Sequence, residues 1–343
     1  MRLASRRWVR VATGSIITIC FLFMVLRGLD IGRVRGSIAQ IRWSVLASAV
    51  MFLAAGYAVR TVRWWWMLRA CNADIEWRAC VWPLFAGVAV NNVVPFRAGD
   101  VYRIMAFRRQ LRAPVIQLIG TLLIERILDL TVLLGFFLVG VACLKRSENS
   151  VVYTRTALVF AVAIVLAWSL PLVAGRRLEA LFRRWCHHSV LTNRGWANVA
   201  EERIRQLFEA LNIIRKPGRV VALLAVSLVI WGCEGAIFEI VARGLSYHED
   251  IYGPWFAFAS GTLSTLIPSS PGYVGTFDFF AMSGLMEFGA TAAQAAAFAF
   301  VVHVVLWLPI TVAGMTYVVL AAPKPEPIRA NASTLVGSEK EAG

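Results

Sequence analysis

The chain repeats long apolar runs separated by short polar segments, and this pattern restricts it to one class of fold. Several runs, such as 220–241, reach the roughly 20 apolar residues that a helix needs to cross a bilayer. Of the 343 residues, 59% are hydrophobic, whereas soluble domains hold about 45–50%. Apolar residues are continuous within the runs and do not alternate, which disfavours a β-barrel. The sequence therefore predicts an all-α polytopic membrane protein.

One polar stretch interrupts this pattern directly after the apolar run 81–90: Asn91-Asn-Val-Val-Pro-Phe-Arg-Ala-Gly-Asp-Val-Tyr-Arg103. Charged groups at membrane depth cost at least a few kcal/mol each, so they normally face a protein interior or a water-filled cavity. Pro95 removes a backbone donor and Gly99 loosens the backbone. A broken helix is tolerated at that depth only where it is buried or lines a cavity. We interpret the stretch as the tip of a re-entrant segment that holds a polar, anionic group.

A second interruption has the sequence Pro268-Ser-Ser-Pro-Gly-Tyr-Val-Gly-Thr-Phe-Asp278. It separates two apolar arms, 255–267 and 279–288, that are each too short to span. Two short segments interrupted by Gly and Pro indicate a transporter site, often within an inverted repeat. Both interruptions are therefore predicted to be helical hairpins. The residues expected to break the helices are Pro95, Gly99, Pro268, Pro271, Gly272 and Gly275.

The remaining apolar runs predict six full transmembrane helices, and counting the interrupted segments gives seven or eight. Their approximate bounds are 9–26, 43–59, 113–134, 151–174, 220–241 and 295–320. The segment 27–42 has apolar residues at roughly helical spacing and predicts an amphipathic helix at the interface. The segment 60–69 is rich in Trp and Arg, which predicts an interface anchor with arginines reaching lipid phosphates. Residues 1–321 would form one transmembrane domain, followed by a disordered cytoplasmic tail at 322–343.

The chain is basic, with 35 Lys and Arg against 20 Asp and Glu, a formal charge of +15. Ten basic residues lie in the hydrophilic loop 175–219, which we assign to the cytoplasmic side. With both termini in the cytoplasm, most basic residues lie on the cytoplasmic side of a bacterial-type inner membrane. The positive charge is then explained by contact with anionic lipid headgroups. Nucleic-acid binding is not expected, because no aromatic-basic motif accompanies the charge.

No catalytic or metal-binding pattern is apparent. The six cysteines are scattered without a CxxC pair, so neither a metal nor a disulfide is expected. Ser269 and Ser270 do not lie in a G-x-S-x-G sequence, and the prolines around them fit a helix break better. We expect a protein that is not an enzyme and has no cofactor.

The predicted membrane segments hold a constellation of polar residues. Glu125 and Asp129 share a helix face at i, i+4, and Arg97 and Arg126 offer planar donor forks for a phosphate. In an alternative interpretation, the pairs Arg126–Asp129 and Arg97–Asp100 only stabilise the broken helix. The predicted headgroup-binding residues are Asn91, Asn92, Arg97, Asp100, Arg103, Glu125, Arg126, Asp129 and Asp278, with Glu234 and Glu239 as secondary candidates.

Three motifs in this order, Asn92–Arg103, Glu125-Arg-Ile-Leu-Asp129 and Pro268–Asp278, resemble the lysylphosphatidylglycerol synthase transmembrane region family of flippase-like proteins. The resemblance covers about residues 8–321. It implies a region that, in bifunctional members, moves an aminoacylated phospholipid between leaflets. The aminoacyl-transferase domain of those members is not seen after the last span, so we expect a stand-alone member without lysyl transfer. Asp100 stands where Glu is common in the family, which keeps the carboxylate with a shorter reach.

These features predict a membrane protein that translocates, or assists translocation of, a phospholipid or related polar lipid. The expected partners are membrane lipids with anionic phospholipid headgroups, and a homo-oligomer is compatible with the sequence. One alternative is a non-catalytic membrane partner of an enzyme that modifies lipids or glycolipids, including hopanoid pathways. Another is a small-solute transporter, which fits the broken helices but fits the arginine-rich centre less well.

Overall fold

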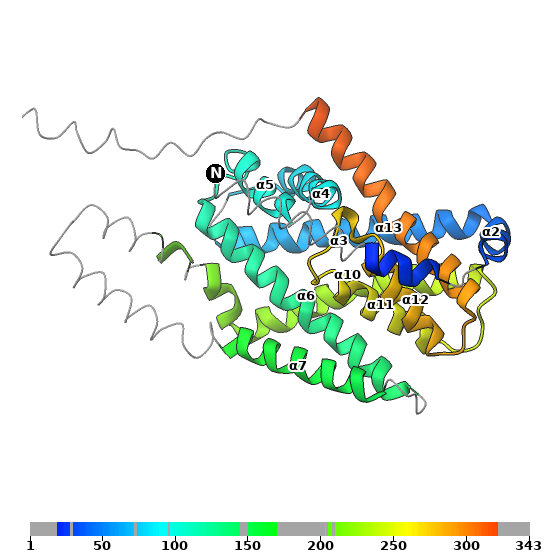
Figure 1. The fold of residues 1–343 in the computed structure, drawn as a ribbon. Coiled ribbons are helices and arrows are strands. Elements are labelled where there is room, and N and C mark those ends of the chain that lie inside the picture. Colours follow the sequence, from blue (N-terminus) through cyan, green and yellow to red (C-terminus); the bar gives the residue numbers. More distant parts are fainter. Residues whose placement is uncertain are drawn as a thin grey trace, which may run out of the picture.

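The computed structural model describes the regions between the predicted N-terminal basic segment and the C-terminal tail. The described residues are 19–27, 30–71, 74–94, 97–144, 150–169, 203, 205–207 and 210–321. Every regular element within them is a helix, which confirms the predicted all-α class (Figure 1). The predicted tail 322–343, most of the predicted loop 175–219, and Pro95 lie outside the described residues.

Five long helices make up most of the bundle. They are α3 (Trp43–Ala70), α6 (Val115–Cys143), α7 (Ser150–Ser169), α10 (Pro217–Gly244) and α13 (Ala292–Leu320). In the described part of the chain, α3, α7, α10 and α13 are long and apolar enough, by length and composition, to cross a membrane. The α6 helix has 29 residues and carries the predicted charged motif. Only residues 19–26 of the first predicted span are described, and they are helical, so the count of six full spans stays a prediction.

Two pairs of short helices occur where the sequence predicted interruptions. The first pair is α4 (Arg78–Val93) and α5 (Ala98–Phe107), and the second is α11 (Tyr252–Ser264) and α12 (Thr276–Met286), joined through the 3-10 turn η3 (Pro271–Tyr273). At about 1.5 Å per residue none of the four reaches the ~30 Å of a bilayer core. The first break lies between α4 and α5, and the second break lies between α11 and α12. The backbone is left-handed at Arg97 in the first break, with φ of 53°, and at Gly272 in the second, with φ of 70°.

The amphipathic helix predicted at 27–42 corresponds to α2 (Ile31–Ala39). Asp30 caps it, because its Oδ1 accepts hydrogen bonds from the backbone N–H of Gly32 at 2.9 Å and of Arg33 at 3.2 Å. Val34 and Ile38 pack against the core. The α2 helix therefore uses its apolar side to contact α13.

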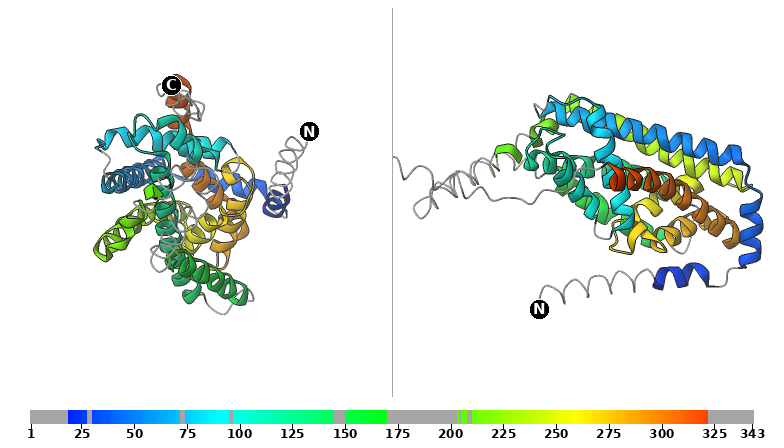
Figure 2. Two further views of the ribbon diagram at one scale, coloured as in Figure 1. Left: turned by 90° about the vertical axis from the view of Figure 1, so that its left-hand side faces the viewer. Right: turned by 90° about the horizontal axis from the view of Figure 1, so that it is seen from above.

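The prediction that the segment 60–69 is an interface anchor is wrong for the residues whose side chains face the protein interior. The α3 helix continues unbroken through this segment, and Arg63 and Trp64 are each 1% exposed. Antiparallel α10 lies alongside α3 over its length, as Figure 2 shows. An arginine can be buried here because carboxylates from distant helices reach it, and the local sequence does not show those partners.

Candidate functional site

A buried ion pair connects three long helices. Arg63 on α3 donates through Nη1 to Oδ1 of Asp129 on α6 and to Oγ of Ser227 on α10, each at 2.6 Å. The indole N–H of Trp231 donates to the same Asp129 oxygen at 3.0 Å. Asp129 is 4% exposed. A charge pair this deep requires such additional hydrogen bonds, so the cluster fixes the relative positions of α3, α6 and α10.

Glu125 extends this cluster to the first helix break. Its Oε2 lies 3.2 Å from Nη2 of Arg103 on α5, and its Oε1 lies 3.8 Å from Nη2 of Arg63. The Arg103 guanidinium also lies over the Trp64 ring, 4.4 Å from its centroid. Arg103 is 2% exposed and Glu125 is 3% exposed. The predicted headgroup residues Arg103, Glu125 and Asp129 therefore belong to one buried network of ion pairs, in which Arg63 connects Glu125 to Asp129.

The first break is tied to α6 by a second set of contacts. Arg126 Nη2 lies 2.9 Å and 3.1 Å from the two carboxylate oxygens of Asp100. Asn91 donates from Nδ2 to Asp100 at 3.1 Å and accepts at Oδ1 from the Gly99 N–H at 2.7 Å. The alternative pairing expected from sequence was thus wrong in its partners: Arg126 pairs with Asp100, and Asp129 pairs with Arg63.

The two breaks contact each other through Arg97. Its Nη2 lies 3.5 Å from the carbonyl oxygen of Thr265, which directly follows α11. Asn91, Arg97, Asp100 and Arg126 therefore lie together around the first break. Glu239 lies apart from them, in an ion pair with Arg243 near the end of α10.

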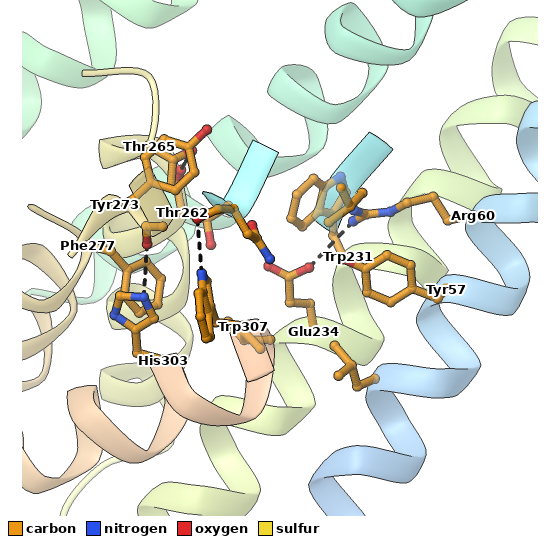
Figure 3. A pocket seen from close by; sticks show the side chains of 15 residues that line it. Tyr57, Arg60, Trp231, Glu234, Thr262, Thr265, Tyr273, Phe277, His303 and Trp307 are labelled. Atoms are coloured by element: carbon orange, nitrogen blue, oxygen red, sulfur yellow. Dashed lines mark hydrogen bonds and ion pairs between the residues drawn. The ribbon is translucent and has the colours of Figure 1, made fainter. Parts of the chain in front are cut away.

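A cavity whose lining combines apolar side chains with a few polar ones, called the polar cavity below, lies between the breaks and the long helices. It has a volume of about 160 Å³ and is lined by residues of α3, α4, α10, α11, η3, α12 and α13. Of the residues that the sequence singled out, Asn92, Glu234 and Gly272 line it. In Figure 3, Arg60, Tyr57 and Trp231 lie on one side of Glu234, and Tyr273, Phe277 and His303 lie on the other.

Arg60 and Glu234 form the ion pair of this cavity. Arg60 Nη2 lies 3.5 Å from Glu234 Oε2, and the guanidinium lies over the rings of Tyr57 and Trp231, at 5.3 Å and 4.8 Å from their centroids. Within the described residues, Nε of Arg60 and Oγ1 of Thr262 are buried without a hydrogen-bond partner. Sequence reasoning assigned Arg60 to the interface. Its spacing of three residues from both Tyr57 and Arg63 was an available signal for one helix face.

Three residues on one face of α13 contact both breaks. His303, Trp307 and Thr311 are spaced four residues apart, so they share a helix face. Trp307 Nε1 donates to the Asn92 carbonyl at 3.4 Å, and Asn92 Nδ2 donates to Thr311 Oγ1 at 2.7 Å. His303 Nε2 lies 2.9 Å from the Gly272 carbonyl oxygen. One helix therefore contacts the first break through Asn92 and the second through Gly272.

His303 also contacts the remaining predicted site residue. Its Nδ1 lies 2.7 Å from Asp278 Oδ1, and Asp278 Oδ2 accepts a hydrogen bond from the Gly275 N–H at 2.8 Å. His303 therefore links α13 to the start of α12.

Two apolar grooves adjoin the polar cavity. One, of about 590 Å³, shares His303 and Trp307 with it and is otherwise lined mainly by apolar residues of 22–38, 274 and 296–304. The other, of about 420 Å³, shares Leu53 and Tyr57 with it. A cavity that holds polar groups and has apolar space on two sides suits an amphiphilic ligand.

The family comparison covers the region that holds this site. The family described as lysylphosphatidylglycerol synthase TM region matches residues 9–314. The chain belongs to this family. The matched region includes both breaks and the whole cavity lining. No match was found among curated proteins. Family membership and the apolar helices make this chain a multi-pass membrane protein tied to lipid metabolism.

Among the described residues, no group of three or more His, Cys, Asp and Glu side chains is placed to hold a metal ion. The groups available to a ligand in the cavity are a guanidinium, a carboxylate, a hydroxyl and aromatic rings. These groups bind and orient polar ligands through charge and hydrogen bonds.

Proposed function

We propose that this protein moves a polar lipid between the leaflets of a bacterial inner membrane, or assists that movement, and is not an enzyme. The observation that carries this proposal is the polar cavity of about 160 Å³ with an apolar groove on each of two sides. A headgroup would occupy the cavity while acyl chains remain in the grooves. Basic loops favour an orientation with both termini in the cytoplasm.

The cavity suits a headgroup because its lining contains the ion pair of Arg60 and Glu234, joined by one contact of 3.5 Å. Buried atoms without hydrogen-bond partners do not distinguish the cavity, because Arg63 and Arg103, which do not line it, also have them. Charged side chains inside a membrane usually face such a cavity and mark a transport pathway.

The deeply buried network has a different role in this proposal. Arg63, Arg103, Glu125 and Asp129 are each at most 4% exposed and contact one another. They would hold the broken helices and α6 in place around the cavity. Arg126, whose side chain is 35% exposed, remains a candidate for contact with a lipid phosphate.

The test is a leaflet-resolved assay in proteoliposomes. Fluorescent phospholipid would be placed in both leaflets, and a membrane-impermeant reductant would quench only the outer one. We expect wild-type protein to expose the inner pool. Val88→Trp, which fills the cavity without changing charge, should slow movement about tenfold, equivalent to ~1.4 kcal/mol.

The matched control is Val229→Trp, which adds the same ring to an exposed position on α10. It should leave the rate unchanged, and both variants should be compared at equal folded amounts. A wild-type rate equal to that of protein-free vesicles would contradict translocation. Equal rates in wild type and Val88→Trp would show that lipid does not use this cavity.

A further inference from the structure

The lining of the cavity contains one positively charged and one negatively charged side chain that pair with each other. Among its 15 lining residues, Arg60 and Glu234 form this pair. The remaining ionisable residue near neutral pH, His303, is already bound to Asp278. The cavity itself therefore has no large excess of either charge, although the whole chain is strongly basic.

The Arg60–Glu234 pair is looser than two of the other ion pairs. It has a single contact at 3.5 Å, whereas Arg63 approaches Asp129 to 2.6 Å and Arg126 makes two contacts with Asp100. Nε of Arg60 has no hydrogen-bond partner among the described residues, as is also the case for Nε of Arg63 and Arg103. The guanidinium is held in place by the rings of Tyr57 and Trp231 more than by the carboxylate.

Each pole of a zwitterion has one partner in this pair. A phosphate offers acceptor oxygens to the Arg60 guanidinium. An ammonium group offers donors to the Glu234 carboxylate. Both side chains line the same cavity.

Net charge decides which headgroup fits. A ligand with a net negative charge would leave one charge uncompensated in a site of low dielectric constant, and this is unfavourable. A headgroup that carries both charges would pair each pole with one side chain and keep the site neutral. Building on the translocation proposed above, we propose that the cavity selects a zwitterionic headgroup, with phosphate at Arg60 and ammonium at Glu234.

This selection differs from the anionic headgroup expected from the sequence. That expectation depended on the arginines near the first break. Arg103 pairs with Glu125, and Arg126 pairs with Asp100. Carboxylates thus balance two of these three arginines, and Arg97 contacts the carbonyl oxygen of Thr265.

Lipid binding to the full-length protein would test the proposal without any measurement of movement. Purified protein would be incubated with equimolar phosphatidylethanolamine and phosphatidylglycerol of identical acyl chains, and bound lipid would be counted by native mass spectrometry. The wild type should retain the zwitterionic lipid at least about fivefold more than the anionic one.

Single neutralising variants should change this ratio in a defined direction. Glu234→Gln leaves the cavity with a net positive charge, so the preference should invert toward phosphatidylglycerol. Arg60→Gln leaves a net negative charge, so a synthetic cationic phospholipid of the same chains should become preferred. Glu249→Gln removes the same charge from an exposed turn and should keep the wild-type ratio.

A double variant guards against effects of an unpaired charge on folding. Arg60→Gln combined with Glu234→Gln keeps the cavity neutral and should retain the two phospholipids about equally. Equal retention of the two lipids by folded wild type, retention of neither, or an unchanged ratio in folded Glu234→Gln would each overturn the selection. Selective binding without transbilayer movement would overturn translocation alone, and movement without selectivity would overturn this inference alone.

Discussion

His303 on α13 lies 2.7 Å through Nδ1 from the carboxylate of Asp278 and 2.9 Å through Nε2 from the carbonyl oxygen of Gly272. Gly272 lies within η3 and Asp278 lies in the first turn of α12, so one side chain of α13 contacts both sides of the turn that joins them. The link between α13 and the second break therefore depends on this imidazole.

The second break should loosen when His303 loses its ring nitrogens. His303→Phe keeps an aromatic ring on α13 but removes the contacts to Asp278 and to the Gly272 carbonyl oxygen. Hydrogen–deuterium exchange of 268–278, measured at one pH, should therefore be faster in the variant than in the wild type.

His248→Phe makes the same change at an exposed position and should leave the exchange of 268–278 unchanged. Equal exchange in the wild type and in His303→Phe would show that other contacts hold the second break.

The Arg63–Asp129 pair should dominate the stability of the bundle. Asp129→Leu leaves the Arg63 guanidinium, of which the side chain is fully buried, without its 2.6 Å partner. Breaking one side of a buried pair costs about 3–5 kcal/mol. Thermal unfolding in detergent should show a large loss for Asp129→Leu and a smaller loss for the double variant Arg63→Met, Asp129→Leu.

The exposed pair of Arg243 and Glu239 supplies the control. The Arg243 side chain is 61% exposed, so Arg243→Ala should change stability by less than about 1 kcal/mol. A similar loss in Arg243→Ala and Asp129→Leu, or a double variant as unstable as the two single changes combined, would contradict a coupled interior pair.

The crossing of α4 and α5 should not tolerate a side chain at Gly99. A Cβ there would lie 1.8 Å from the Gly87 carbonyl oxygen and 2.6 Å from the Asn91 nitrogen. Gly99→Ala should therefore sharply reduce the folded, monodisperse fraction after extraction. Gly232→Ala, where nothing lies within 4 Å, should be neutral or stabilise α10 by up to about 1 kcal/mol. Equal folded fractions of the two variants would contradict the close approach.

Local signals in the sequence were sufficient for the helices and their breaks. Long apolar runs predicted α10 and α13, and the glycines at 99, 272 and 275 marked positions where the chain turns or approaches another segment closely. These features depend on neighbouring residues, so they can be read without knowing the fold.

The partners of the charged residues could not be read in this way. Arg63 and Asp129 are 66 residues apart, and Arg60 and Glu234 are 174 apart. The segment 60–69 has the composition of an interface anchor, and only tertiary packing shows that Arg60 and Arg63 face inward whereas Arg69 is exposed. The spacing of His303, Trp307 and Thr311 was visible, but their partners lie on two breaks far away in the chain.

Trp307 should control access between the cavity and the larger apolar groove. It lines both spaces and donates to the Asn92 carbonyl at 3.4 Å. Trp307→Phe keeps an aromatic ring but removes the donor and reduces the wall, so lipid should enter more easily. Transbilayer movement in the proteoliposome assay should rise about threefold or more. Leu308→Ala, at an exposed position on the same helix, should leave the rate unchanged. A slower rate in folded Trp307→Phe would mean that this side chain guides the lipid and does not obstruct it.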